Sequence, residues 1–489
     1  MSDDSECTHL CMAHCIDARS QPPQSPCVNL LSNNFAPRDD SQIHEIRNAI
    51  QGAEAELDRL QDRLRATIAR ITSQRAALQE FVNSHRGVAC GLRRFPNEIL
   101  VEIFSHCIHP TLPPCHPDAA LSSVISVCTR WRAVALASPS LWRYFTFDGD
   151  IKPWMQIADL RRLVSLQVQR SSGTPLSVRL MGYVSDVDFL DVLLKVSCRW
   201  QTATLQVGQT LYNRLFKCRP DFTILKELTL EFEEPICDDD VAAKFVQSLP
   251  SLVDLTLQLP RYGRIPDAFK SLWPQLLACT LVKCTGVFPI LPSFSPDTRL
   301  TLWRCSLSDM ADPLDAPVHS AISALTIRRC YSKFVDELAK VLVAPRLKKF
   351  AFFERNGELS SISRFLGHSS CTLTHLTIHL NAYSDATLGE LLTILDSPCA
   401  RYIVDLDLHY RFPKEVVDAL ATRDIVPVLR SLSLRDCRGL DDADVMALHA
   451  RRRPVLQQLC GPANSLVLSQ GVVQALEAAG LEVVITAGR

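Results

Sequence analysis

The sequence predicts an α/β protein in which a solenoid of short parallel strands alternating with helices follows a small unit of three helices and a long N-terminal helix. Three patterns in the 489 residues support this: a recurring apolar phrase, a heptad repeat, and two amphipathic segments between them. We expect a disordered tail over residues 1–42, a coiled coil over 43–86, a helical domain over 92–147 and the solenoid over 150–489.

The solenoid is predicted from a phrase of the form apolar-x-x-apolar-x-apolar. Clear copies begin at residues 163, 225, 252, 322, 347, 373, 403 and 429, and weaker ones lie near 277, 299 and 455. Successive copies from Leu228 to Leu432 are 21 to 30 residues apart. This resembles the period of about 20–29 residues in leucine-rich repeats, whose short strands stack into a horseshoe. Helix-like stretches such as KFVDELAKVLV separate the phrases, and the faint pattern between 166 and 225 predicts a distorted start.

The long N-terminal helix is predicted from a heptad repeat. Its a positions are Ile43, Ile50, Leu57, Leu64, Ile71 and Leu78, and its d positions include Ile46, Ala53, Leu60 and Phe81, with polar Thr67 and Gln74 between. Such a pattern favours a coiled coil, in a rod of about 60 Å at about 1.5 Å per residue. It fits a homodimer through residues 43–81, and equally a solvated helix packed on its own C-terminal domain. The preceding tail lacks periodicity and is rich in Pro, Ser and Asp.

The helical domain is predicted from two amphipathic segments. Ile99, Leu100, Ile103 and Phe104 of FPNEILVEIF lie on one helical face, and so do Leu121, Val124, Ile125, Cys128, Trp131 and Ala135 of the second segment. The proline-rich HPTLPPCHPDAA forms a loop between them, and Ser138 and Pro139 cap and begin a third short helix. Together, FPNEILVEIFSHC and VISVCTRWRAVALASPSLWRYF resemble an F-box, in particular the fungal form. Phe95 stands where many F-boxes have leucine.

The F-box resemblance implies a partner. In that family the domain binds the Skp-type adaptor of an SCF ubiquitin ligase, and through it a cullin. Carried over position by position, it implies eight residues that contact the adaptor or support those that do: Pro96, Ile99, Leu100, Ile103, Phe104, Val127, Cys128 and Trp131. The resemblance does not separate these two roles.

The strands of the solenoid are expected to present a second surface. Side chains between the repeat leucines alternate away from the core, toward a concave face. The candidate target-binding residues there are Lys226, Glu227, Asp254, His375, Asp405 and Asp407. Under ~30 % of residues in an interface carry most of its binding energy, so we expect the majority to be only solvated. The phrase LRSLSLRDCRGLDDADVMAL resembles the cysteine-containing leucine-rich repeat found behind many F-boxes.

Composition argues against several other classes. With 52 Lys and Arg against 53 Asp and Glu, the net charge of −1 offers no excess of cations for nucleic acid. No stretch of about 18 apolar residues is present for a membrane span. The 19 scattered cysteines are typical of free thiols in a reducing compartment, so we expect a cytoplasmic or nuclear protein.

Metal and catalytic chemistry find little support. Cys7, His9, Cys11, His14 and Cys15 form one Cys/His cluster, and His106, Cys107, His109, Cys115 and His116 another, but neither has two separated ligand pairs, so no metal site is predicted. The phosphate-loop, dinucleotide, nucleophile-elbow and zincin motifs are missing, and no cofactor is expected.

The patterns together predict a non-catalytic receptor that binds the adaptor through residues 92–147 and an unknown protein target through residues 150–489. The alternative is a coiled-coil scaffold without a degradation role. A third possibility is a leucine-rich-repeat enzyme or enzyme regulator, whose activity would survive deletion of residues 92–147.

Overall fold

The computed structural model divides the chain into two compact units, residues 1–96 and 97–489. The residues it describes are 24–33, 35–89, 91–108, 120–147, 157–182, 188–208, 211–212, 214–215, 220–234, 239–307, 316–354, 359–380, 385–409, 414–435, 440–462 and 468–486.

The first unit is built on one long helix. Its elements are α2 (Val28–Asn33), α3 (Asp40–Ala89) and the short η1 (Gly91–Arg94). The predicted disordered tail is therefore wrong over 28–33 and from residue 40 onward, while residues 1–23 lie outside the described part. Helix α3 starts early because the Asp39 carboxylate accepts the Gln42 N–H at 2.9 Å and the Gln42 side chain accepts the Arg38 N–H at 2.9 Å, which together satisfy free backbone donors.

The second unit opens with short helices. They are α4 (Asn97–Cys107), α5 (Ala120–Val127), α6 (Thr129–Leu136) and the 3₁₀ turn η2 (Pro139–Trp142). The predicted second helix is thus two helices, because Cys128 is extended (φ −159°) and its Sγ accepts the Trp131 N–H at 3.4 Å as the cap of α6. The Ser138 hydroxyl donates to the Val134 carbonyl instead of capping η2, contrary to expectation.

Among the described residues, a sheet of fourteen parallel strands follows, in chain order. Its strands are β1 (Tyr144–Phe147), β2 (Leu176–Leu180), β3 (Trp200–Val207), β4 (Glu227–Phe232), β5 (Asp254–Gln258), β6 (Ala278–Val282), β7 (Arg299–Trp303), β9 (Ala324–Arg328), β11 (Lys349–Glu354), β12 (His375–Leu380), β13 (Asp405–His409), β14 (Ser431–Arg435), β15 (Gln458–Pro462) and β16 (Glu482–Thr486). A separate pair joins β8 (Val318–His319) to β10 (Leu342–Val343). The predicted α/β solenoid is confirmed.

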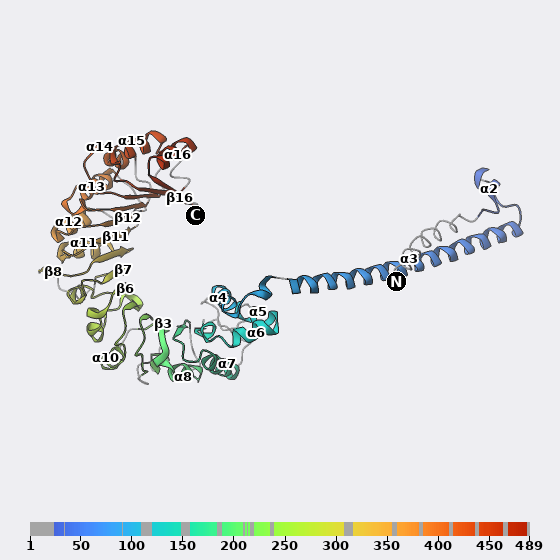
Figure 1. Cartoon of the computed structure of the whole chain (residues 1–489), viewed down its shortest axis with the longest axis horizontal. Helices are drawn as coiled ribbons and strands as arrows, with labels where there is room; N and C mark the ends of the chain where they lie inside the picture. Colours follow the sequence, from blue (N-terminus) through green and yellow to red (C-terminus); the bar gives the residue numbers. More distant parts are fainter. Residues whose placement is uncertain are drawn as a thin grey trace. The chain divides into compact units, whose positions relative to one another are not determined.

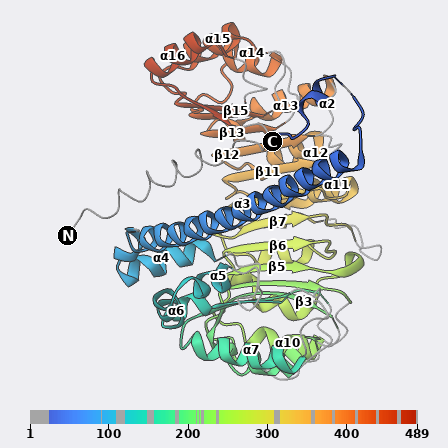
Figure 2. The same cartoon turned by 90° about the vertical axis from the view of Figure 1, so that its right-hand side faces the viewer.

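Helices connect most of the strands. They are α7 (Ile157–Arg170), α8 (Asp188–Leu194), α10 (Asp239–Gln247), α11 (Ser332–Val341), α12 (Leu359–Ser369), α13 (Asp385–Leu395), α14 (Lys414–Thr422), α15 (Asp442–Arg452) and α16 (Gln470–Ala478). Within this unit the strands line the inner side of a curved stack, and α10 to α16 lie along the outside (Figure 1). Figure 2 shows the strands one above another in a single ladder.

Several repeat assignments need correction at the start of the solenoid. The phrase at residue 163 lies in α7, because apolar-x-x-apolar spacing also fits one face of a helix. The faint stretch instead holds β2 and β3, and the sheet already begins with β1 at Tyr144–Phe147, inside the span assigned to the helical domain. The weaker copies near 277, 299 and 455 do form strands, namely β6, β7 and β15.

Between β5 and β7 the connections are 3₁₀ turns. They are η4 (Pro260–Tyr262), η5 (Asp267–Ser271), η6 (Trp273–Gln275) and η7 (Phe288–Ser293). Prolines in this stretch remove the N–H donors that a continuous α-helix needs, which explains the shorter repeats here. Within the described residues, no helix has both the length and the apolar character needed to cross a bilayer.

Candidate functional site

The helical domain divides the predicted adaptor-binding residues into two groups. Leu100 and Phe104 are fully buried, in a small core with Leu121, Val124, Val134, Ala135, Leu141 and Trp142. Ile103 and Trp131 are partly buried against this core, and the Trp131 ring lies 4.9 Å from that of Phe104. Leu100 and Phe104 therefore support the fold and are not available to a partner.

The other predicted adaptor-binding residues lie at the surface. Ile99 is 47 % exposed and Val127 58 % exposed, and Cys128 is also exposed. The Asn97 side chain accepts two hydrogen bonds from the Arg130 guanidinium, at 3.0 and 3.3 Å, and so joins the start of α4 to the start of α6. Ile99 follows Asn97 by two residues, and Val127 and Cys128 come shortly before Arg130; we call these three exposed residues the helix-end surface. Pro96 is exposed at the end of the other unit.

The helical domain and the solenoid share a tight junction. Gln167 of α7 donates to the carbonyls of Trp142 and Tyr144, at 3.2 and 2.7 Å. The Arg170 guanidinium lies 4.5 Å from the centre of the Trp142 ring. Since the chain passes from the helical core at Trp142 to the sheet core at Phe145 without a linker, the two parts are held in a fixed relation.

The exposed face of the sheet is organised in rows. Threonines occupy the middle position of six successive strands, β3 to β9, in direct register: Thr204, Thr229, Thr256, Thr280, Thr301 and Thr326. Each is half-buried, while the alternate leucines, isoleucines and cysteines point into the core. A row of short β-branched side chains leaves the inner face of the sheet shallow and lined with hydroxyls.

Along the carboxyl ends of the strands runs a row of aromatic and basic side chains. Trp303, Arg328, Phe353, His379 and His409 are register partners on β7, β9, β11, β12 and β13. The Arg328 guanidinium lies 5.8 Å from the Trp303 ring and 5.0 Å from the Phe353 ring. The row continues with Phe353 5.6 Å from His379, which stacks on His409 at 4.8 Å.

The structure separates the six predicted target-binding residues into two groups. Glu227 and Asp254 are paired neighbours on β4 and β5, with Lys226 exposed just before β4. His375, Asp405 and Asp407 lie on β12 and β13, with four strands between the groups. The six therefore do not form one site.

The electrostatics of the two groups differ. Partial burial and then the neighbouring Glu227 raise the pKa of the Asp254 carboxyl. Partial burial and then Lys349 lower the pKa of His375, whose Nε2 lies 3.3 Å from Oδ2 of Asp405. His409 makes a longer contact of 3.6 Å with Asp407.

Residues on the central strands were missed by sequence analysis. Arg299, Trp303, Arg328, Lys349 and Phe353 all lie on the inner face, between the two predicted groups. The signal was in the sequence: LWRC, TIRRC and FAFFE place aromatic or basic residues at or next to the last position of successive strands. The repeat phrase marks the core positions, whereas these residues lie on the opposite face of the strands.

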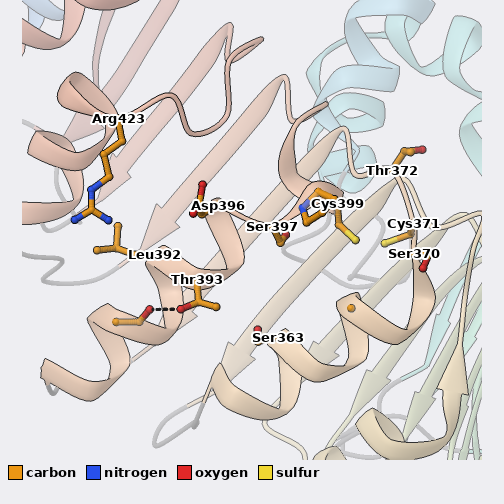
Figure 3. Close-up of a pocket in the computed structure, with 13 residues that line it drawn as sticks. Ser363, Ser370, Cys371, Thr372, Leu392, Thr393, Asp396, Ser397, Cys399 and Arg423 are labelled. Carbon is orange, nitrogen blue, oxygen red and sulfur yellow. Dashed lines mark hydrogen bonds between the residues drawn. The ribbon is translucent and has the colours of Figure 1, made fainter.

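A cavity of about 790 Å³ lies between α12 and α13 (Figure 3). Ser363, Gly367, Gly389 and Thr393 line it, with the buried Cys371 and Cys399 facing one another at one side. None of the predicted residues lines this cavity. No group of metal-ligating side chains occurs among the described residues. The first Cys/His cluster, and His109, Cys115 and His116 of the second, lie outside them.

Comparison with known proteins adds one family match. The solved structures similar to this chain include a protein from Bacteroides fragilis (11 % identity, TM-score 0.30, covering 66 % of this chain and 78 % of that one). They also include the Rad7 and Elc1 complex from yeast (14 % identity, TM-score 0.29, covering 75 % and 96 %). No curated protein matches the chain. Residues 92–148 match the family model described as F-box-like, which confirms that the short helices before the solenoid form an F-box-like domain.

Proposed function

We propose that this chain is the substrate receptor of an SCF-type ubiquitin ligase. F-box domains bind Skp-type adaptors, and the F-box-like match at residues 92–148 is the observation that carries the proposal. The adaptor docks on the helix-end surface and brings the cullin, while the inner face of the solenoid holds a target protein. The chain itself supplies no catalytic group and acts in the cytoplasm or nucleus.

The tight junction supports this role. A receptor works by raising the local concentration of target lysines near the ubiquitin-conjugating enzyme. Because Gln167 and Arg170 tie the first turn of the solenoid to Trp142, a bound target would be held in a defined position relative to the adaptor. A flexible connection would lose part of that effective concentration.

The test is a capture experiment from host cells with full-length protein. We expect wild type to recover both the Skp-type adaptor and the cullin. Ile99→Asp/Val127→Asp should recover neither, because it places charges in an apolar contact without touching the core. Arg364→Glu, on the exposed side of α12, is the matched surface control. Recovery of the adaptor without cullin by wild type would favour the scaffold alternative, and recovery of neither would contradict the proposal.

Helix α3 supports a further part of the proposal, a homodimer through residues 43–81. The a-position side chains of Ile50, Leu57, Leu64, Ile71 and Leu78 are each more than half exposed on the single chain, as expected for a seam that a second helix covers. Two receptors would then offer paired sites to one target. We expect light scattering to give two chain masses at micromolar concentration, and Leu57→Asp/Leu64→Asp to give one. One chain mass for wild type would contradict the dimer.

A further inference from the structure

Cationic side chains gather on and next to the central strands of the solenoid. Arg299, Arg328 and Lys349 lie on β7, β9 and β11, and Arg304 and Arg329 directly follow β7 and β9. All five are exposed. Within the described residues, none of them lies within ion-pair distance of a carboxylate. The acidic residue at the end of β11, Glu354, accepts the backbone N–H of Cys330 at 2.6 Å. We call these five residues the cationic centre.

Backbone geometry holds part of this centre in place. Arg304 and Arg329 adopt positive φ, 52° and 49°, and donate their backbone N–H groups to the carbonyls of Arg328 and Phe353, at 2.9 and 2.8 Å. Positive φ is rare in residues other than glycine and is held here by the turn that ends each strand. The two arginines therefore recur at the same place in successive repeats, beside Arg328.

Aromatic side chains prepare Arg328 for an anionic ligand. Its guanidinium lies near both the Trp303 and Phe353 rings, and such stacking leaves the N–H groups at its edge free to pair with a carboxylate. Trp303 is 36 % exposed, so the same place offers apolar contact. Tyr331, three residues after the end of β9, is 51 % exposed, and its hydroxyl lies 2.7 Å from that of Tyr262.

Acidic side chains flank the cationic centre on both sides along the sheet. Glu227, Glu231 and Asp254 lie on β4 and β5, and Asp405 and Asp407 on β13. A negatively charged partner is therefore attracted at β7 to β11 and repelled at both flanks. At about 4.8 Å per strand, the face between these flanks, from β6 to β12, measures roughly 19 Å, the length of about six extended residues.

We propose that the cationic centre binds an extended protein segment rich in Asp and Glu, with an apolar side chain that packs on Trp303. The proposal rests on the proposed function, since it names the kind of target segment that the solenoid would hold. The threonine row offers hydroxyls to the backbone of that segment, and the acidic flanks set its position along the face.

The test is fluorescence anisotropy with purified full-length protein. The probe is a labelled peptide of about six residues, made of Asp and Glu with one central Leu, as long as the face between the flanks. We expect binding that weakens as salt rises, and a loss of about tenfold or more in Arg328→Glu. Trp303→Ser should weaken binding without changing the salt dependence. Arg364→Glu, the same charge change on the outer helix α12, should bind as wild type does.

Three results would overturn the inference. They are equal binding of a peptide with Lys in place of Asp and Glu, binding only of a phosphoserine version, and equal loss in Arg328→Glu and Arg364→Glu. Adaptor capture measured on the same preparation separates this inference from the proposed function. Adaptor binding without peptide binding rejects the inference alone, and peptide binding without adaptor binding rejects the receptor role alone.

Discussion

The F-box-like helices and the solenoid use opposite designs for their surfaces. In the described part of the helices, a core of eight side chains leaves Ile99 and Val127 exposed. In the solenoid, one continuous core takes alternate apolar side chains of the strands, and the inner face carries polar and charged side chains with a few aromatic ones. An apolar contact on a small domain suits an invariant partner, whereas a long charged face gives selectivity among targets through complementary charge. Under the proposed function, one chain would keep a constant contact apart from a selective one.

The largest expected effect comes from comparing substitutions at two adjacent residues, the buried Leu100 and the exposed Ile99. Leu100→Asp should disrupt the helical domain, at a cost of more than about 4 kcal/mol, because it buries a carboxylate in the small core. Ile99→Asp should change the free energy of unfolding by less than about 0.5 kcal/mol, because that side chain is exposed. Hydrogen exchange of the backbone amides in α4 to α6 measures the stability change in both variants. Equal protection in the two variants would show that the burial assigned to Leu100 is wrong.

The next largest expected effect is a loss of folding stability on substitution of Arg452, near the C-terminal end of the solenoid. The buried Arg452 guanidinium donates to the carbonyls of Leu420, Val426 and Ile425, at 2.8, 3.1 and 2.5 Å. Arg452→Met removes these buried hydrogen bonds, and we expect a loss of about 2–4 kcal/mol. Because repeats contact only their neighbours, increased hydrogen exchange should stay near β13 to β15. Arg451→Met, at an exposed position, is the control, and equal effects of the two variants would refute this role.

The smallest expected effect is a dependence of folding stability on pH, caused by His449 in the same region. His449 is buried, and within the described residues neither ring nitrogen has a hydrogen-bond partner. Burial, and then Arg453, lower its pKa below the ordinary value. The unfolded chain therefore binds the proton more readily, and stability falls as pH drops below about 6.5, by at most about 1.4 kcal/mol per pH unit.

Denaturant unfolding between pH 7 and 5 measures this dependence. His449→Leu should flatten the pH profile, whereas His368→Leu, at an exposed position on α12, should leave it unchanged. A profile for His449→Leu that matched wild type would contradict the assignment.

Much of the fold could be predicted because its signals are local. The repeat phrase predicts the strands of the large sheet from β4 to β15, since each needs two leucines or their equivalents on the core side, but it does not predict β16. The same phrase failed at 163, where Leu160 and Val164 are buried at helical spacing. The break at Cys128 was also missed, because Leu121, Val124 and Ala135 fit one helical face whether or not the helix continues.

The site was less predictable, because it depends on what lies side by side across strands. Resemblance named Leu100 and Ile99 together, and only packing separates a core residue from a contact residue. Asp254 and His375 were chosen for their charge within single phrases, whereas the stacking of Arg328 on Trp303 and Phe353 joins residues about 25 positions apart. The register of β7, β9 and β11 places Trp303, Arg328 and Phe353 side by side.

The central claim is that the helix-end surface binds a Skp-type adaptor. The most direct measurement is calorimetric titration of purified full-length protein with purified adaptor. The account predicts a complex of one adaptor per chain, lost in Ile99→Asp/Val127→Asp and kept in Arg328→Glu. Absence of binding by wild type, or unchanged binding by the double variant, would contradict it.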